Sequence, residues 1–366
     1  MLKYRLAFAS IRGMGVNLAE RLLGVVGPED EFFSLTETQL QLITGFSNRI
    51  YSKKYRQDLL EQAQRELDFL SRNNIKTLYY TDAAYPQRLL HAPDAPCLLF
   101  TTGTCDLNAA HVVSVVGTRH ATPYGTSWTA DFVDRLSRRL PDTIVVSGLA
   151  YGIDISAHRA CLRSGLPTVA VMARGLNAIY PAHHRNDAAA IVRSGGMCLT
   201  EYRSFDTIHR SNFLARNRII AGMADCTVVV ESASTGGALV TASLAASYNR
   251  DVMAVPGRVG DEFSKGCNKL ICSNRALAIT CADDLLKAMR WDEHAIDEAA
   301  QLEIFPELTS EQQTVVDLLK SGGDMHINSI AEQAGMPVYR VMAALVELDC
   351  KGLVLTLPGS RYAIRK

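Results

Sequence analysis

The stretch VVSVVGTRHATPYG, residues 112–125, decides the fold of this chain. It opens with Val112–Val116, a short and nearly continuous β-branched run that is typical of a strand buried on both faces. The run ends in Gly117-Thr118-Arg119, a glycine turn that carries an arginine towards the start of a helix. A strand, a glycine turn and a helix N-terminus in this order make a good seat for a phosphate group.

The alternation of strand and helix patterns continues through the middle of the chain. Further β-rich runs occur at residues 143–146, 168–171, 197–199, 227–230, 251–255 and 278–280. Continuous apolar strands separated by helices are typical of a parallel sheet that is covered by helices on both faces. We therefore predict an α/β domain over residues 76–287, built as an extended Rossmann-like doubly wound sheet. Ligands bind such sheets at the carboxyl ends of the strands.

Smaller units are predicted on either side of the sheet domain. Residues 1–75 have apolar residues at helical spacing, with glycine turns at Gly13-Met14-Gly15 and Thr44-Gly45 as in helix–hairpin–helix units. Residues 288–307 form an acidic linker. Residues 308–366 contain three helical segments and then a hairpin pattern, which is the layout of a winged helix.

The composition excludes several classes of protein. The chain has 366 residues, 48% of them hydrophobic, which is enough to bury a core, and its apolar runs fall short of the ~18 residues that a membrane span needs. The N-terminus lacks a signal-peptide pattern, so we predict a soluble, cytoplasmic protein with no membrane partner. The nine cysteines include no C-x-x-C pair, so we expect reduced thiols and no metal site. Basic and acidic residues balance at 38 each, so attraction for nucleic acid must come from a local patch.

Basic residues and glycines gather in the loops that follow the predicted strands. The candidate binding residues are Gly117, Thr118, Arg119, Arg174, Arg210, Arg216, Arg218, Gly236 and Gly237. Arginines can hold phosphates, and the nearby Tyr202, Phe205 and Phe213 can stack on bases, a combination that single-strand binders use. Arg216 and Arg218 have an alternative interpretation, as members of internal ion pairs.

The same loops contain no convincing catalytic group. Residues 117–125 do not form a G-x-G-x-x-G motif, and no acidic residue follows about 20 positions on to hold a ribose, so we expect no dinucleotide cofactor. Asp154 and His158 lie one helical turn apart, but no nucleophile is in reach, so we interpret them as a helix N-cap and a packed side chain. We therefore predict a binding protein and not an enzyme, with no catalytic residue.

Seven blocks of sequence resemble the DNA-processing protein A (DprA/Smf) family. In chain order they are VVGTRHATPYG, VVSGLAYGIDISAH, GLNAIYP, FLARNRIIAGMAD, GGALVTASLAA, VPGR and GCNKLI. The resemblance implies an N-terminal helical domain of the helix-hairpin-helix or SAM-like kind, an extended Rossmann domain and a C-terminal winged-helix domain. It also implies a function: binding and protection of incoming single-stranded DNA, and loading of the RecA recombinase onto that DNA during natural transformation.

The resemblance also implies a homodimer formed through the Rossmann domain and roles for particular residues. It implies that Arg119, in the G-[ST]-R block, and Arg210, just before the F-x-x-R-N-R block, face DNA phosphates. Arg174 adds charge next to Gly175. Many family members read S-G-S-L where this chain reads GGAL at residues 236–239, so two hydroxyls are missing.

Two other functions are weighed against DNA binding. A nucleotide phosphoribohydrolase of the lysine-decarboxylase-like Rossmann family would carry a glutamate three residues beyond Thr241, where this chain has Leu244. A scaffold that has lost DNA binding would not need basic loops at strand ends. The third helix of the predicted winged helix has only Arg340 as a basic residue, so we expect this domain to serve protein contacts or regulation more than base readout.

Overall fold

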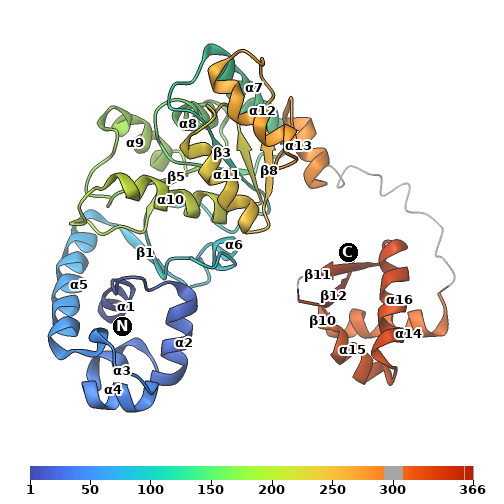
Figure 1. The fold of residues 1–366 in the computed structure, drawn as a ribbon, viewed down its shortest axis with the longest axis horizontal. Helices are drawn as coiled ribbons and strands as arrows, with labels where there is room; N and C mark the ends of the chain where they lie inside the picture. The colour runs from blue at the N-terminus through green and yellow to red at the C-terminus, as the bar shows by residue number, and fades with distance from the viewer. Residues whose placement is uncertain (292–307, 358, 366) are drawn as a thin grey trace. The chain divides into compact units, whose positions relative to one another are not determined.

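The computed structural model describes residues 1–291, 308–357 and 359–365, which fall into two compact units (Figure 1). The first unit is Met1–Trp291 and the second lies within Asp292–Lys366. Most of the predicted acidic linker, residues 288–307, lies outside the described residues. No helix in the described part of the chain is long and apolar enough to cross a membrane.

The first unit is built on a nine-stranded sheet in the order β1-β2-β6-β5-β4-β3-β7-β8-β9. Its strands are β1 Lys76–Tyr79, β2 Leu98–Gly103, β3 Val112–Val116, β4 Ile144–Ser147, β5 Thr168–Val171, β6 Met197–Thr200, β7 Cys226–Val229, β8 Asp251–Ala254 and β9 Leu277–Ala278. All neighbours from β6 through β9 pair in parallel, with β3 between β4 and β7. The predicted doubly wound sheet is therefore confirmed, with β3 at its centre.

The structure adds two strands, β1 and β2, which were not predicted from the sequence, and they make one edge of the sheet antiparallel. β1 pairs with β2 and β2 with β6 in antiparallel register, with Lys76 opposite Thr101 and Phe100 opposite Thr200. Parallel neighbours need a crossover connection, usually an α-helix that packs across the sheet. The connection from β1 to β2 contains only the single-turn helix α6, Gln87–Leu90, which is too short for that role.

Helices cover both faces of the sheet because side chains alternate along each strand. Val112 and Val116 pack with α10 and α11, whereas Val113 and Val115 pack with α7, α8 and α13. Figure 1 shows these helices around the sheet. The helix α9 joins the α8 face over β5 and β6. These helices are α7 Pro123–Arg139, α8 Ile153–Ser164, α9 Arg185–Arg193, α10 Arg210–Met223, α11 Gly237–Ser247, α12 Lys265–Cys272 and α13 Ala282–Met289.

The N-terminal helices form a second core against the β1 edge of the sheet (Figure 1). They are α1 Leu2–Ala9, α2 Val16–Val26, α3 Glu29–Ser34, α4 Glu37–Thr44 and α5 Lys53–Asn73. Their apolar side chains pack with Tyr79 of β1 and with Leu98 and Phe100 of β2. Because these strands belong to both cores, the N-terminal helices and the sheet make one compact unit.

The second unit has the predicted three helices and hairpin. Its elements are α14 Ser310–Gly322, β10 Met325–His326, α15 Ile327–Ala334, α16 Val338–Cys350, β11 Val354–Leu357 and β12 Arg361–Ile364. The short strand β10 extends the hairpin to three strands in the order β10-β12-β11. Val315, Ile330, Leu345 and Leu348 are fully buried between the helices.

Candidate nucleic-acid interface

A cleft of about 740 Å³ opens at the carboxyl edge of the sheet. It lies where β3 and its neighbour β7 end. After β3 the chain continues to β4 on one side of β3, and β7 lies on the other side, so the strand order reverses here. This is the topological switch point at which doubly wound sheets bind ligands. The cleft is lined by residues 117–120 after β3, residues 232–238 around the start of α11, and the first half of α10.

The loop from β3 to α7 is held at both ends. Thr118 N–H donates to the Glu231 carbonyl at 2.7 Å. The buried Glu231 carboxylate accepts from Thr122 N–H at 2.9 Å and from the Thr122 hydroxyl at 2.5 Å, and the Thr122 side chain caps α7. Gly117 is required here because a Cβ would lie 2.4 Å from the Ile153 side chain. Sequence reasoning missed Glu231, whose role depends on two segments that meet only in the fold.

Arg119 lies between these anchors and is exposed. Its guanidinium carbon lies 5.3 Å from the centroid of the Phe213 ring on α10, a cation–π contact. Tyr180, 46% exposed, meets Phe213 edge to face at 5.3 Å. An arginine beside two aromatic rings offers a phosphate contact next to a stacking surface. The sequence indicated Phe213, but Tyr180 was not singled out because it lies far away along the chain.

Arg210 adds a second basic side chain to the cleft, and Arg174 adds one to an adjoining pocket. Arg210 is exposed and is the first residue of α10. Arg174 follows β5 and lines a small inner pocket of about 90 Å³ together with Arg119. The Nε of Arg174 is buried without a hydrogen-bond partner among the described residues. Within that part of the chain neither Arg119 nor Arg210 forms an ion pair, so both charges are available to an anion.

The glycine turn after β7 presents backbone to the same cleft. Gly236 and Gly237 are exposed, and α11 begins at Gly237 without a side-chain cap. The first N–H groups of a helix have no intrahelical partner and favour negative charge. The turn therefore leaves backbone N–H groups open to the cleft, and its contact with a phosphate stays a prediction.

Arg216 lines the floor of the cleft and of the inner pocket, although little of it is exposed. It is 4% exposed, and its guanidinium donates to the Gly148 carbonyl at 2.7 Å and to the Val171 carbonyl. Asp154, also buried, lies near it: burial raises the pKa of Asp154, and the Arg216 charge opposes that shift. Arg216 therefore joins the ends of β4 and β5 from beneath and adds positive potential to the floor of the cleft.

Arg218 does not join the cleft. It forms an ion pair with Glu201, both side chains being 17% exposed, and lines a separate pocket beside the turn between α1 and α2. Two residues along a helix correspond to a rotation of about 200°, so Arg216 and Arg218 point to opposite sides of α10. The structure thus places Arg218 in the internal ion pair that was the alternative interpretation of its sequence.

Asp154 and His158 are not arranged as a catalytic pair. The N-cap of α8 is Gly152, so the prediction that Asp154 is the N-cap is wrong. Asp154 is one residue inside the helix and accepts backbone hydrogen bonds from Gly148 and Ala150. His158 is fully buried, and its Nδ1 pairs with the Thr168 hydroxyl at 2.8 Å. Its interpretation as a packed side chain is confirmed.

Buried His158 is expected to make stability depend on pH. Burial, helped by the Arg216 charge, lowers the pKa of His158 to about 3, whereas an unfolded histidine titrates near 6.5. Since the folded pKa is the lower one, the stabilisation is complete above pH ~6.5 and is lost as the pH falls towards ~3. Melting temperatures between about pH 7.5 and 4.5 should fall more steeply for wild type than for His158→Gln. Parallel curves would contradict this account.

Comparison with known families decides where the chain belongs. Residues 76–290 match the family described as DNA recombination-mediator protein A, and residues 297–360 match the DprA winged helix domain. The chain belongs to the DprA family. The resemblance found in the sequence is therefore confirmed, and so is the extended Rossmann-like domain with a winged helix beyond it.

Individual DprA family members are similar over most of their length. Protein Smf of Escherichia coli K12 is 33% identical over 84% of this chain and 85% of its own. The DNA processing protein DprA of Streptococcus pneumoniae R6 is 37% identical over 56% of this chain and 71% of its own.

Two solved DprA structures share the fold. The X-ray structure of DNA processing protein A from Streptococcus pneumoniae covers 78% of this chain and 98% of its own, at 29% identity and a TM-score of 0.65. A structure of DNA processing protein A from Helicobacter pylori, which concerns that protein's single-stranded-DNA binding mode, covers 60% of this chain and 96% of its own, at 26% identity and a TM-score of 0.52.

Proposed function

We propose that this DprA family member binds single-stranded DNA in the cleft at the carboxyl edge of its sheet and acts as a mediator of recombination. The observation that carries the proposal is the meeting of Arg119 and Arg210 with Phe213 and Tyr180 in one open cleft. Arg174 lines the adjoining inner pocket, which shares Arg119 and both aromatic rings with the cleft. Cations beside aromatic rings suit a flexible strand, whose phosphates and unpaired bases are both accessible. A stiff duplex would keep its bases stacked and paired.

The proposed mechanism is binding without chemistry. The guanidinium groups of Arg119, Arg210 and Arg174 contact phosphates, and N–H groups of the Gly236-Gly237 turn add neutral donors. Phe213 and Tyr180 receive bases without sequence preference, because every base has a π-face. A salt series of DNA binding with single arginine variants tests this assignment.

The groups around the cleft favour a binder over a hydrolase. Both carboxylate oxygens of Glu231 are engaged by Thr122, behind the loop. Asp154 is buried and hydrogen-bonded to backbone. Position 244, where the phosphoribohydrolase alternative needs a glutamate, is leucine. Release of free base from nucleoside monophosphates by the purified protein would contradict the proposal.

We further propose that the protein forms a homodimer through its Rossmann-like domain, protects incoming DNA in the cytoplasm and loads RecA recombinase during natural transformation. Two linked clefts would raise the apparent affinity for a long strand without any new contact. Sedimentation velocity measures the dimer, and RecA nucleation on DNA coated with single-strand-binding protein measures the loading. A monomer at all concentrations, or no acceleration of nucleation, would contradict the respective proposal.

For the winged helix, residues 308–366, we propose a role in protein contacts. The single basic residue of α16, Arg340, pairs with Glu311 at 3.1 Å. Its exposed face instead carries Tyr339, Met342 and Val346. A helix that reads DNA is usually basic. We propose that residues 1–75 and 76–287 are the other two domains, joined in one compact unit, and that residues 288–307, which begin with the end of α13, lead to the winged helix. Limited proteolysis should cut between the two units and leave the first unit whole.

A further inference from the structure

The loop that delivers Arg210 to the cleft has no helix or strand of its own. It runs from residue 201, after β6, to residue 209, and Arg210 then opens α10. We call residues 201–209 the β6–α10 loop. A segment without a backbone ladder needs other contacts to hold one conformation. Its contacts therefore decide how well Arg210 is placed.

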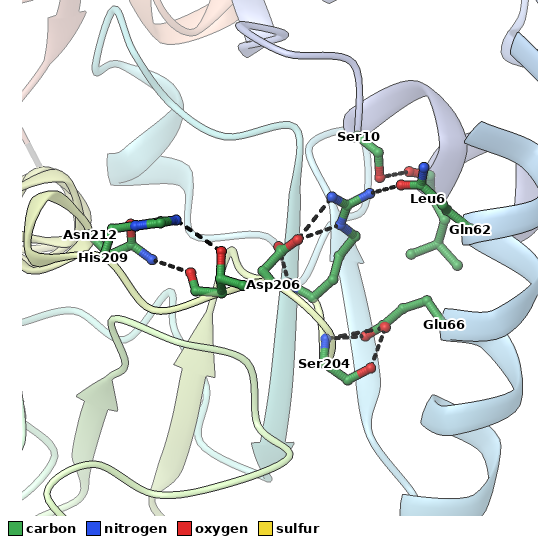
Figure 2. Close-up of polar contacts among 10 residues, drawn as sticks. Leu6, Ser10, Gln62, Glu66, Ser204, Asp206, His209 and Asn212 are labelled. Carbon is green, nitrogen blue, oxygen red and sulfur yellow. Dashed lines mark hydrogen bonds and ion pairs between the residues drawn. The ribbon is translucent and has the colours of Figure 1, made fainter. Parts of the chain in front are cut away.

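The middle of the β6–α10 loop is held by a helix of the N-terminal region (Figure 2). Glu66 of α5 is 2% exposed. Its carboxylate accepts from the Ser204 N–H at 3.0 and 3.1 Å and from the Ser204 hydroxyl at 2.6 Å, across 138 residues of sequence. Gln62, one turn earlier on α5, accepts from Arg203 at 3.0 Å. A buried carboxylate is stable only with its donors in place, so Glu66 strongly favours this loop conformation.

The rest of the loop transmits this constraint to the start of α10. Arg203 is bonded to Asp206, with its Nη2 2.8 Å from the Asp206 carboxylate, and the Arg203 N–H also donates to that carboxylate at 2.8 Å. Thr207 contacts His209 at 2.8 Å and accepts from Asn212, inside α10, at 3.4 Å (Figure 2). Contacts within the loop thus hold the residues on both sides of Ser204, from Arg203 to the first turn of α10.

The turn that carries Arg174 rests on the same loop. A Cβ at Gly175 would lie 2.3 Å from the Arg203 carbonyl oxygen and 2.9 Å from Ser204 Cα, so the two segments touch through their backbones. The next residue, Leu176, packs on the core of the N-terminal helices. Movement of Ser204 would therefore disturb both Arg174 and Arg210.

We propose that Glu66 is a positioning residue for single-stranded-DNA binding. By holding Ser204, Glu66 allows the N-terminal helices to influence the DNA affinity of the cleft, although these helices do not line the cleft. The inference rests on the proposed function of the cleft. Its physical basis is preorganisation, because a loop that is already ordered loses less entropy when it binds a ligand.

The test measures DNA affinity in full-length variants by fluorescence anisotropy with oligothymidine. Glu66→Ala should weaken binding about fivefold, and Ser204→Ala, which keeps the backbone bonds and loses the hydroxyl bond, about twofold. Glu66→Gln, which keeps one carbonyl acceptor, should recover part of the loss. Glu61→Ala, an exposed carboxylate on the same helix, is the matched control and should bind like wild type.

A double variant separates positioning from general damage. If Glu66 acts through Arg210, the loss of DNA affinity caused by Glu66→Ala should be smaller in an Arg210→Ala background than in the wild-type background. Full additivity, or a folded Glu66→Ala protein with wild-type affinity, would overturn the inference. Should Glu66→Ala fail to fold, the Ser204→Ala comparison still decides. If the wild-type protein shows no salt-dependent DNA binding, the proposed function itself is refuted. Failure of the Glu66 inference and failure of the proposed function therefore give different results.

Discussion

Replacing Arg119 or Arg210 by alanine is expected to weaken single-stranded-DNA binding about tenfold each, since a hydrogen bond to a charged group contributes about 1.5–3 kcal/mol. Both guanidinium groups are exposed at the cleft and form no ion pair with the described residues. Their full charge is therefore free for phosphate. Arg174 has a smaller expected effect because it is half-buried in the inner pocket.

The salt dependence distinguishes a lost phosphate contact from a distorted site. Each phosphate contact releases counterions, so each variant should flatten the slope of log affinity against log salt by about 0.7. Arg193→Ala is a matched control: this exposed arginine lies in the last turn of α9, ahead of β6 and so at the opposite edge of the sheet. If Arg119→Ala lowers the affinity but leaves the slope of log affinity against log salt unchanged, Arg119 contacts a base or neighbouring protein groups and not a phosphate.

Arg216→Met is expected to lower the free energy of unfolding of the first unit by about 3 kcal/mol, because it leaves a buried charge without its counterpart. The substitution keeps most of the side-chain volume but removes the bonds to the Gly148 and Val171 carbonyls. It also leaves Asp154 buried beside an apolar group. Trp128 and Trp291 both pack on the α7 face, so tryptophan fluorescence during urea unfolding reports on this unit.

Two comparisons test the explanation for Arg216. Arg138→Met breaks a surface ion pair with Asp134, in which the Arg138 side chain is 72% exposed and the Asp134 side chain 50%. It should change the free energy of unfolding by less than about 0.5 kcal/mol. In an Asp154→Asn background the loss from Arg216→Met should shrink by about 1 kcal/mol, since the uncompensated charge is gone. Equal losses for Arg216→Met and Arg138→Met would refute the buried-charge account.

The sequence predicted the parts of the site that depend on neighbouring residues. The pattern predicted a strand at Val112–Val116, a turn with Gly117 and Arg119, and then a helix, and the structure contains β3, this turn and α7 in that order. The Gly236-Gly237 turn follows the same logic at the start of α11. Both turns reach one cleft because parallel strands present their carboxyl ends at one edge.

Other features required the three-dimensional fold. Arg216 and Arg218 look alike in the sequence, and the phase of α10 decides that one supports the cleft and the other pairs with Glu201. β1 and β2 can pair in antiparallel register because the connection between them lacks a full helix. Strand propensity in the sequence does not reveal how two strands pair. Glu66 lies in the polar pattern of a helix, and its burial follows only from the approach of Ser204.

The measurement that tests the central claim most directly is a titration of fluorescent oligothymidine with wild type and with the Arg119→Ala/Arg210→Ala double variant at several salt concentrations. We predict salt-dependent binding by wild type, and in the double variant an affinity lower by about a hundredfold and a slope flatter by about 1.4. Absence of salt-dependent binding by the wild-type protein would contradict the assignment of the cleft as the DNA site. A double variant with the same affinity and salt dependence as wild type would contradict it as well.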